Sequence, residues 1–139
     1  MICVVGLKRI RYKPFKIIMH DLGRIKSKNK KFSLMVIDVV EKLPNTISGR
    51  AIANQIVRNG TSVGANYRAV CRARSDRGFI SKMSIVIEEA DETLFWIEIL
   101  QEKKWIDYTQ LNQIWKEGNE LTAIFVSTVK SIKSRINKS

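Results

Sequence analysis

The chain has 139 residues, of which 45% are hydrophobic and 27% charged, proportions typical of a single soluble globular domain. Lysine and arginine number 25 against 13 acidic residues, so the net charge is +12, which favours an anionic partner such as nucleic acid over a neutral one. No apolar run is long enough to span a bilayer, and Cys3 and Cys71 do not have metal-binding spacing, which excludes a membrane-spanning helix and a cysteine-based metal site.

The positive charge is concentrated at the N-terminus, because residues 1–31 contain Asp21 as their only acid. We therefore expect a flexible basic arm over residues 1–27, followed by a helical domain over residues 28–137. Met19 is an alternative translation start, which would make the preceding apolar and basic piece an extension. The alternative to an anion-binding role is that the charge merely keeps a basic protein soluble.

The first helix is expected from about residue 30 to residue 43, and Pro44 ends it because the residue before a proline avoids the helical conformation. Ser48 or Thr46 then serves as the N-cap of the next helix. The inward face of the first helix comprises Phe32, Val36, Val39, Val40 and Leu43.

Residues 48–74 are expected to form one helix with two opposed faces, since each residue advances about 100° around the axis. The apolar face comprises Ile52, Ile56, Val63, Tyr67 and Val70, and the opposite face comprises Arg50, Asn54, Arg58, Arg68 and Arg72. Gly60 and Gly64 lie together beside the apolar face, which favours close approach of another helix there. The alternative is a break into two helices at Asn59 and Gly60. Cys71 flanks the inward face, which predicts a buried thiol in a reducing cytosol.

Two further helices complete the pattern. Ser75 is the expected N-cap of a helix that ends near Lys103, and a turn over residues 105–107 leads to a last helix over residues 109–136. The core positions of these helices are Phe79, Ile80, Met83, Val86, Ile87, Ala90, Leu94 and Ile97, and then Leu111, Ile114, Gly118, Leu121, Phe125, Thr128 and Ile132. No segment alternates with period two, so the sequence predicts an all-α fold, an antiparallel up-down four-helix bundle.

The third helix carries a second apolar strip, on the side away from its core face. The expected interface comprises Ile85, Glu88, Glu92, Trp96 and Ile99, with Phe95 and Glu89 beside them. We interpret this strip as an oligomer interface whose carboxylates pair with arginines of a neighbouring subunit. The alternative is that the N-terminal arm folds back over it.

Groups that could carry catalysis are few. His20 lies outside the expected bundle, and Glu88 and Glu92 point away from the core without the Glu-x-x-His motifs of a di-metal bundle. The segment from Gly60 to Gly64 lacks the Gly-Lys-Ser/Thr of a phosphate-binding loop. We therefore expect a protein that is not an enzyme and that uses no catalytic residue, metal or cofactor.

Two long motifs carry a family resemblance. NQIVRNGTSVGANYRAVCRARS, followed by FISKMSIVIEEADETLFWIEIL, resembles the bacterial 23S rRNA intervening-sequence proteins, a likeness that covers residues 28–136. The matching positions are Asn54, Gln55, Arg58, Ser62, Gly64, Asn66, Tyr67, Arg68 and Arg72 in the second helix, and Glu89, Asp91, Glu92 and Trp96 in the third. Ala69 departs from the glutamate that relatives often have there. If that glutamate orders an arginine in relatives, the arrangement differs in this chain.

The resemblance implies a four-helix bundle assembled as a pentamer with a basic, nucleic-acid-binding surface. A related branch of the family is the accessory protein of diversity-generating retroelements, which acts alongside a reverse transcriptase.

Guanidinium groups bind phosphate through two parallel hydrogen bonds, so the arginines supply a mechanism for the nucleic-acid binding that the resemblance implies. We expect Arg50, Arg58, Arg68, Arg72 and Arg74 to contact the backbone of RNA or DNA. Three alternatives remain open: the arginines pair with acids of an adjacent subunit, the protein is a helical adaptor for a partner such as a reverse transcriptase, or it is a structural oligomer without a ligand.

Overall fold

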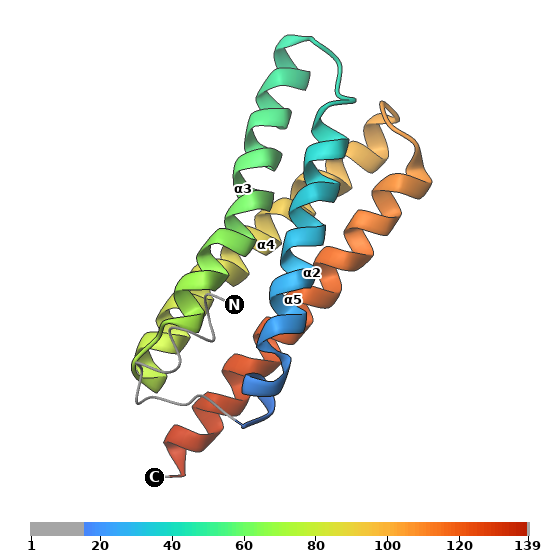
Figure 1. The fold of residues 1–139 in the computed structure, drawn as a ribbon. Helices are drawn as coiled ribbons and strands as arrows, with labels where there is room; N and C mark the ends of the chain where they lie inside the picture. Colours follow the sequence, from blue (N-terminus) through green and yellow to red (C-terminus); the bar gives the residue numbers. More distant parts are fainter. Residues whose placement is uncertain (1–15, 139) are drawn as a thin grey trace.

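A computed structural model describes the backbone of residues 16–138 and the side chains of residues 22–138. This part of the chain consists of four helices without a strand (Figure 1). They are α2 (Lys16–Val40), α3 (Ile47–Cys71), α4 (Asp76–Lys103) and α5 (Tyr108–Asn137). The all-α prediction is therefore confirmed.

Each of the last three helices begins with a side-chain cap. The oxygens of Thr46, Ser75 and Asp107 accept hydrogen bonds from the backbone N–H three residues further on, at 3.1, 3.0 and 3.3 Å. Each bond satisfies one of the amides that a first helical turn leaves without a partner. The structure thus selects Thr46 rather than Ser48 as the cap of α3 and confirms Ser75 as the cap of α4.

The helices form an up-down bundle. Each of α3, α4 and α5 packs against the helix that precedes it, and α2 also packs against α5, which closes the bundle. The connecting segments, residues 41–46, 72–75 and 104–107, are short, so successive helices run antiparallel (Figure 1).

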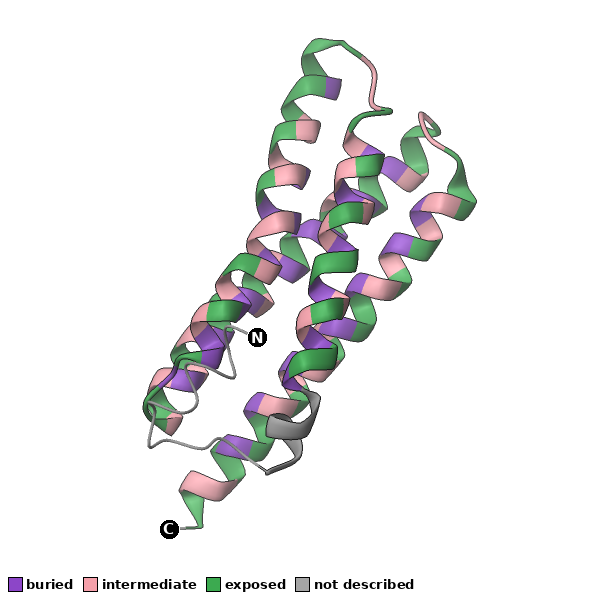
Figure 2. Cartoon of the chain, in the orientation of Figure 1, coloured by how far each residue is buried: buried purple, intermediate pink, exposed green. Residues whose placement is uncertain are grey.

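The core runs along the bundle axis, where the buried sides of the helices face one another (Figure 2). The apolar faces predicted from periodicity supply most of it, and the rings of Tyr67 and Phe125 meet with their centroids 5.7 Å apart. One position of α5 differs from the prediction: Val129 is buried, while Thr128 is half-buried. Cys71 is buried, as predicted.

The first helix begins earlier than the sequence analysis placed it, at Lys16 rather than near residue 30. Leu22 and Ile25 are buried in the core, because they fall on the same face of α2 as Phe32. Residues 22–27, assigned to the basic arm, are therefore part of the bundle. Residues 16–21 of the predicted arm belong to α2 as well, and residues 1–15 lie outside the described residues.

The second helix is continuous through its two glycines, so the predicted alternative of a break at Asn59 and Gly60 is wrong. A Cβ atom on Gly60 would lie 2.6 Å from Cγ2 of Val36 in α2, and one on Gly64 would lie 3.4 Å from Cβ of Asn29. Gly60 therefore lets α2 and α3 approach closely, as predicted, whereas an alanine at Gly64 would make only ordinary contacts. None of the helices in the described part of the chain is long and apolar enough to cross a membrane.

Candidate nucleic-acid interface

The five arginines assigned to phosphate binding are exposed in the structure. Arg50, Arg58 and Arg68 lie on α3, on the side that faces away from the core, as the helical periodicity predicts. Among the described residues, none of the five lies within ion-pair distance of a carboxylate. Within residues 22–138, ion pairs therefore do not neutralise their guanidinium groups.

Two arginines differ in position from the prediction. Helix α3 ends at Cys71, so Arg72 is its C-cap and Arg74 lies in the turn before α4, rather than both lying on the helix. The Arg72 N–H donates to the carbonyl of Ala69, three residues back, which tightens the end of the helix. Arg72 and Arg74 thus lie beyond the C-terminal end of α3, where cations also stabilise the helix dipole.

Arg50 and Arg58 are held by local hydrogen bonds. Arg50 Nη1 donates to the side-chain and backbone oxygens of Asn45, at 2.9 and 3.3 Å, and Arg58 Nη2 donates to Gln55 Oε1 at 2.8 Å. Both acceptors are neutral, so the positive charge of each guanidinium is retained. These bonds restrict the rotamers of the two arginines, which lowers the entropy that a bound phosphate would have to remove.

Arg58 also acts on a carboxylate of α4. Burial raises the pKa of Glu89 above its ordinary value, the neighbouring carboxylates of Glu92 and Glu88 raise it further, and the positive charge of Arg58 lowers it. The Oε2 atom of Glu89 is buried and has no hydrogen-bond partner among the described residues. Arg58 is exposed to solvent, and its charge also acts on Glu89, at the contact between α3 and α4.

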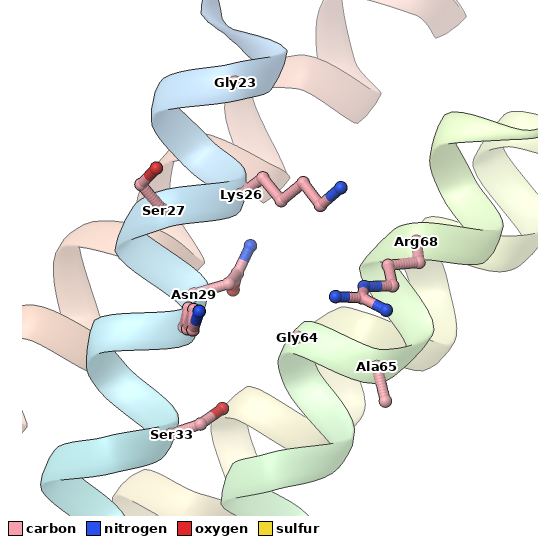
Figure 3. Close-up of a pocket in the computed structure, with 9 residues that line it drawn as sticks. Gly23, Lys26, Ser27, Asn29, Ser33, Gly64, Ala65 and Arg68 are labelled. Carbon is pink, nitrogen blue, oxygen red and sulfur yellow. The ribbon is translucent and has the colours of Figure 1, made fainter. Parts of the chain in front are cut away.

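Arg68 faces α2 across a groove with a volume of about 630 Å³. Lys26, Asn29 and Lys30 line the opposite wall (Figure 3). The sequence analysis missed these three residues because it placed residues 1–27 in an arm and gave Lys30 and Asn29 no partner helix. The i, i+4 spacing of Lys26 and Lys30, which sets both on one helical face, was the signal that could have found them.

The apolar strip predicted on α4 is largely exposed. The exposed fractions are 47% for Ile85, 52% for Phe95 and 37% for Ile99, and Glu88 and Glu92 are also exposed. Trp96 differs from its neighbours because it is half-buried and packs against the core. Its ring meets that of Phe95 edge-on at 5.1 Å, and its buried Nε1 has no hydrogen-bond partner among the described residues. Several large apolar side chains exposed along one helix are typical of an interaction site.

The groups considered for metal or phosphate-loop chemistry are not assembled into such sites. Residues 22–138 contain no cluster of three or more His, Cys, Asp or Glu side chains that could hold a metal ion. The segment from Gly60 to Gly64 is helical rather than a loop, so its amides are engaged within α3. The side chain of His20 lies outside the described residues.

Comparison with known proteins decides the family. The model of the family described as 23S rRNA-intervening sequence protein matches residues 23–127. The chain belongs to this family. Among solved structures, it is similar to a protein of unknown function from the S23 ribosomal protein family of Bacteroides thetaiotaomicron VPI-5482. The two share 32% sequence identity with a TM-score of 0.71, over 76% of this chain and 98% of the other. No match was found among the curated proteins.

The family match begins at residue 23, inside the segment that the sequence analysis assigned to the arm. It therefore includes Lys26, Asn29 and Lys30 of the groove as well as the arginines of α3. The predicted resemblance to the 23S rRNA intervening-sequence proteins is confirmed. The predicted link to retroelement accessory proteins stays a prediction.

Proposed function

We propose that this member of the 23S rRNA-intervening sequence family is a non-enzymatic, oligomeric, cytoplasmic protein that binds the phosphate backbone of RNA or DNA. The observation that carries the proposal is the set of exposed arginines on α3 and its C-terminal turn without intrasubunit carboxylate partners. An exposed arginine without a carboxylate partner is free to bind phosphate, which accepts two hydrogen bonds from one guanidinium group.

The proposed recognition is by charge and shape. The described helices offer no sheet with stacking aromatics, and the charged side chains that α3 exposes are the cations of Arg50, Arg58 and Arg68. Each phosphate bound by an arginine releases condensed counterions, so affinity should fall steeply as salt rises. We then expect the affinities for RNA and DNA of equal length to differ less than the affinity for either one changes between low and high salt.

The test is fluorescence anisotropy with labelled RNA and DNA at increasing salt. Charge reversal at Arg58 and Arg72 should weaken binding about tenfold or more and reduce the salt slope by roughly one for each lost contact. The matched control is Lys116→Glu with Lys133→Glu, which reverses the charge of two exposed lysines of α5 outside the proposed face. Absence of binding, or binding whose affinity does not change with salt, would refute the proposal.

For assembly, we propose that the α4 strip is the contact between subunits. Its exposed isoleucines, Ile85 and Ile99, lie on either side of Glu88 and Glu92, whose exposed carboxylates would pair with cations of a neighbour. Sedimentation should give a multimer for the parent protein and a smaller particle for Ile85→Glu with Ile99→Glu. The matched control is Leu34→Glu with Ile47→Glu, which alters two apolar side chains that are equally or more exposed but lie outside the strip.

The adaptor function predicted as an alternative assigns the arginines to a protein partner instead of nucleic acid. It is favoured if charge reversal at Arg58 and Arg72 spares nucleic-acid affinity while a partner such as a reverse transcriptase no longer co-purifies. Loss of nucleic-acid affinity in the same variant argues against it.

A further inference from the structure

The groove between α2 and α3 gathers cations from both helices. Lys26 and Lys30 lie one helical turn apart on α2, and Arg68 lies across the groove on α3. Figure 3 shows the Lys26 and Arg68 side chains extending toward one another, with Asn29 below Lys26 on the α2 wall. Like charges at i, i+4 repel, so the arrangement costs stability unless an anion balances it.

The lysines on the other side of α2 are balanced. Lys28 Nζ lies 3.5 Å from a carboxylate oxygen of Glu117 and 3.1 Å from one of Glu120, and Lys31 Nζ lies 3.3 Å from Glu117, all toward α5. Within residues 22–138, Lys26, Lys30 and Arg68 have no such carboxylate. The same helix therefore has one neutralised flank and one flank whose charge is left for a ligand.

Asn29 supplies a second, independent observation. Its side chain is only 1% exposed, and neither Nδ2 nor Oδ1 has a hydrogen-bond partner among the described residues. A buried amide without a partner is costly, and native proteins nearly always satisfy it. Because Asn29 also lines the groove, a ligand there can accept a hydrogen bond from Nδ2.

Gly64 leaves room for that ligand. A Cβ atom at this position would lie 3.4 Å from Cβ of Asn29 and 3.5 Å from Oγ of Ser33, so a side chain of any length would cover the floor of the groove. The volume of about 630 Å³ is within the range of small-molecule sites. The groove thus combines three cations, a buried amide donor and open space.

We propose that this groove is a binding site for one phosphate group, held by Lys26, Lys30 and Arg68 and hydrogen-bonded to Asn29 Nδ2. The proposal rests on the proposed function in one respect, since we assign the bound phosphate to the backbone of a nucleic acid. Free phosphate would present the same oxygens. Three charges converging on one group would fix the path of the strand, whereas the other four exposed arginines act singly.

The test uses two probes, inorganic phosphate and a short labelled RNA. Phosphate should raise the melting temperature of the full chain above that in chloride of equal ionic strength, and it should shift the NMR signal of the Asn29 side-chain amide. Lys26→Gln with Lys30→Gln should abolish both effects and weaken RNA binding about tenfold or more. The control pair, Lys116→Gln with Lys133→Gln, carries the same charge change and should keep both effects.

A second variant separates binding from folding. Asn29→Asp keeps the shape of the side chain but replaces the amide donor by a carboxylate, so it should abolish phosphate binding while the three nearby cations keep the fold stable. Retention of the phosphate effects in both Asn29→Asp and the lysine pair would overturn the site.

The outcomes distinguish this site from the proposed function. RNA binding that depends on Arg58 and Arg72 but is equal in the groove variant and its control overturns the groove and leaves the function standing. A second outcome is that the phosphate effects require Lys26 and Lys30 but the protein binds neither RNA nor DNA. This result refutes the proposed function, supports the site and identifies its ligand as free phosphate. Absence of every effect refutes both.

Discussion

Replacing Gly60 by alanine tests how closely α2 and α3 are packed. The new methyl group would lie 2.6 and 2.8 Å from the two γ-carbons of Val36 and 3.1 Å from its Cβ. Valine has a stiff χ1 and Val36 is fully buried, so it cannot turn aside without moving α2. Overpacking typically costs about 1–3 kcal/mol, and contacts under 3 Å place this change in the upper part of that range.

The gain in helix propensity partly offsets the clash. Alanine is better than glycine in a helix interior by about 1 kcal/mol, which leaves a net loss of about 1–2 kcal/mol for Gly60→Ala. Urea denaturation followed by circular dichroism should show this as a lower midpoint with an unchanged slope. Protein concentration must be fixed, because assembly would add to the apparent stability.

Gly64→Ala is the matched control. It has the same helix and the same chemical change, but its methyl group would make ordinary contacts, the nearest at 3.4 Å, so the propensity gain should dominate and stabilise by about 0.5–1 kcal/mol. In a Val36→Ala background, Gly60→Ala should lose most of its cost because the clashing methyl groups are absent. An equal cost in both backgrounds, or equal effects at the two glycines, would show that the helix contact is not its cause.

Three further changes should alter stability. Burial, and next the Glu92 carboxylate, raise the pKa of Glu89 in the folded state. The folded state therefore binds this proton more tightly than the unfolded state does. The free energy of unfolding should fall as pH rises from the ordinary carboxyl pKa through the raised one. Glu89→Gln should therefore be more stable than the parent at neutral pH, by an amount that shrinks on acidification in pH-dependent urea titrations; a gain that does not vary with pH would contradict this. Asp76→Asn should cost about 1 kcal/mol by removing the ion pair to Arg135 and a favourable charge in the first turn of α4, a loss that salt should reduce in thermal melts. Thr46→Ala should cost about 1 kcal/mol through loss of the α3 cap, and here salt should have little effect, since the capping oxygen is neutral.

Periodicity and capping chemistry together predicted most of the fold. Apolar residues at helical spacing identified the core faces of α3, α4 and α5, and Ser75 marked the start of α4, because these signals arise within one or two turns of chain. The start of α2 was predicted wrongly. The segment containing Leu22 and Ile25 also contains Gly23 and is followed by the polar Asn29 at a buried position, which interrupts the apolar spacing, so its helical conformation depends on packing rather than on a strong local pattern.

The sequence alone determined which side of α3 its arginines occupy, because spacing along a single helix fixes the direction of each side chain. Only the tertiary structure decided which residues of other helices face them. Lys26 and Lys30 join Arg68 because Gly60 lets α2 pack closely against α3, and Lys28 and Lys31 are neutralised because α5 presents Glu117 and Glu120 to them. Such pairings join residues distant in sequence, so they follow from the geometry of packing and not from the pattern of any one helix.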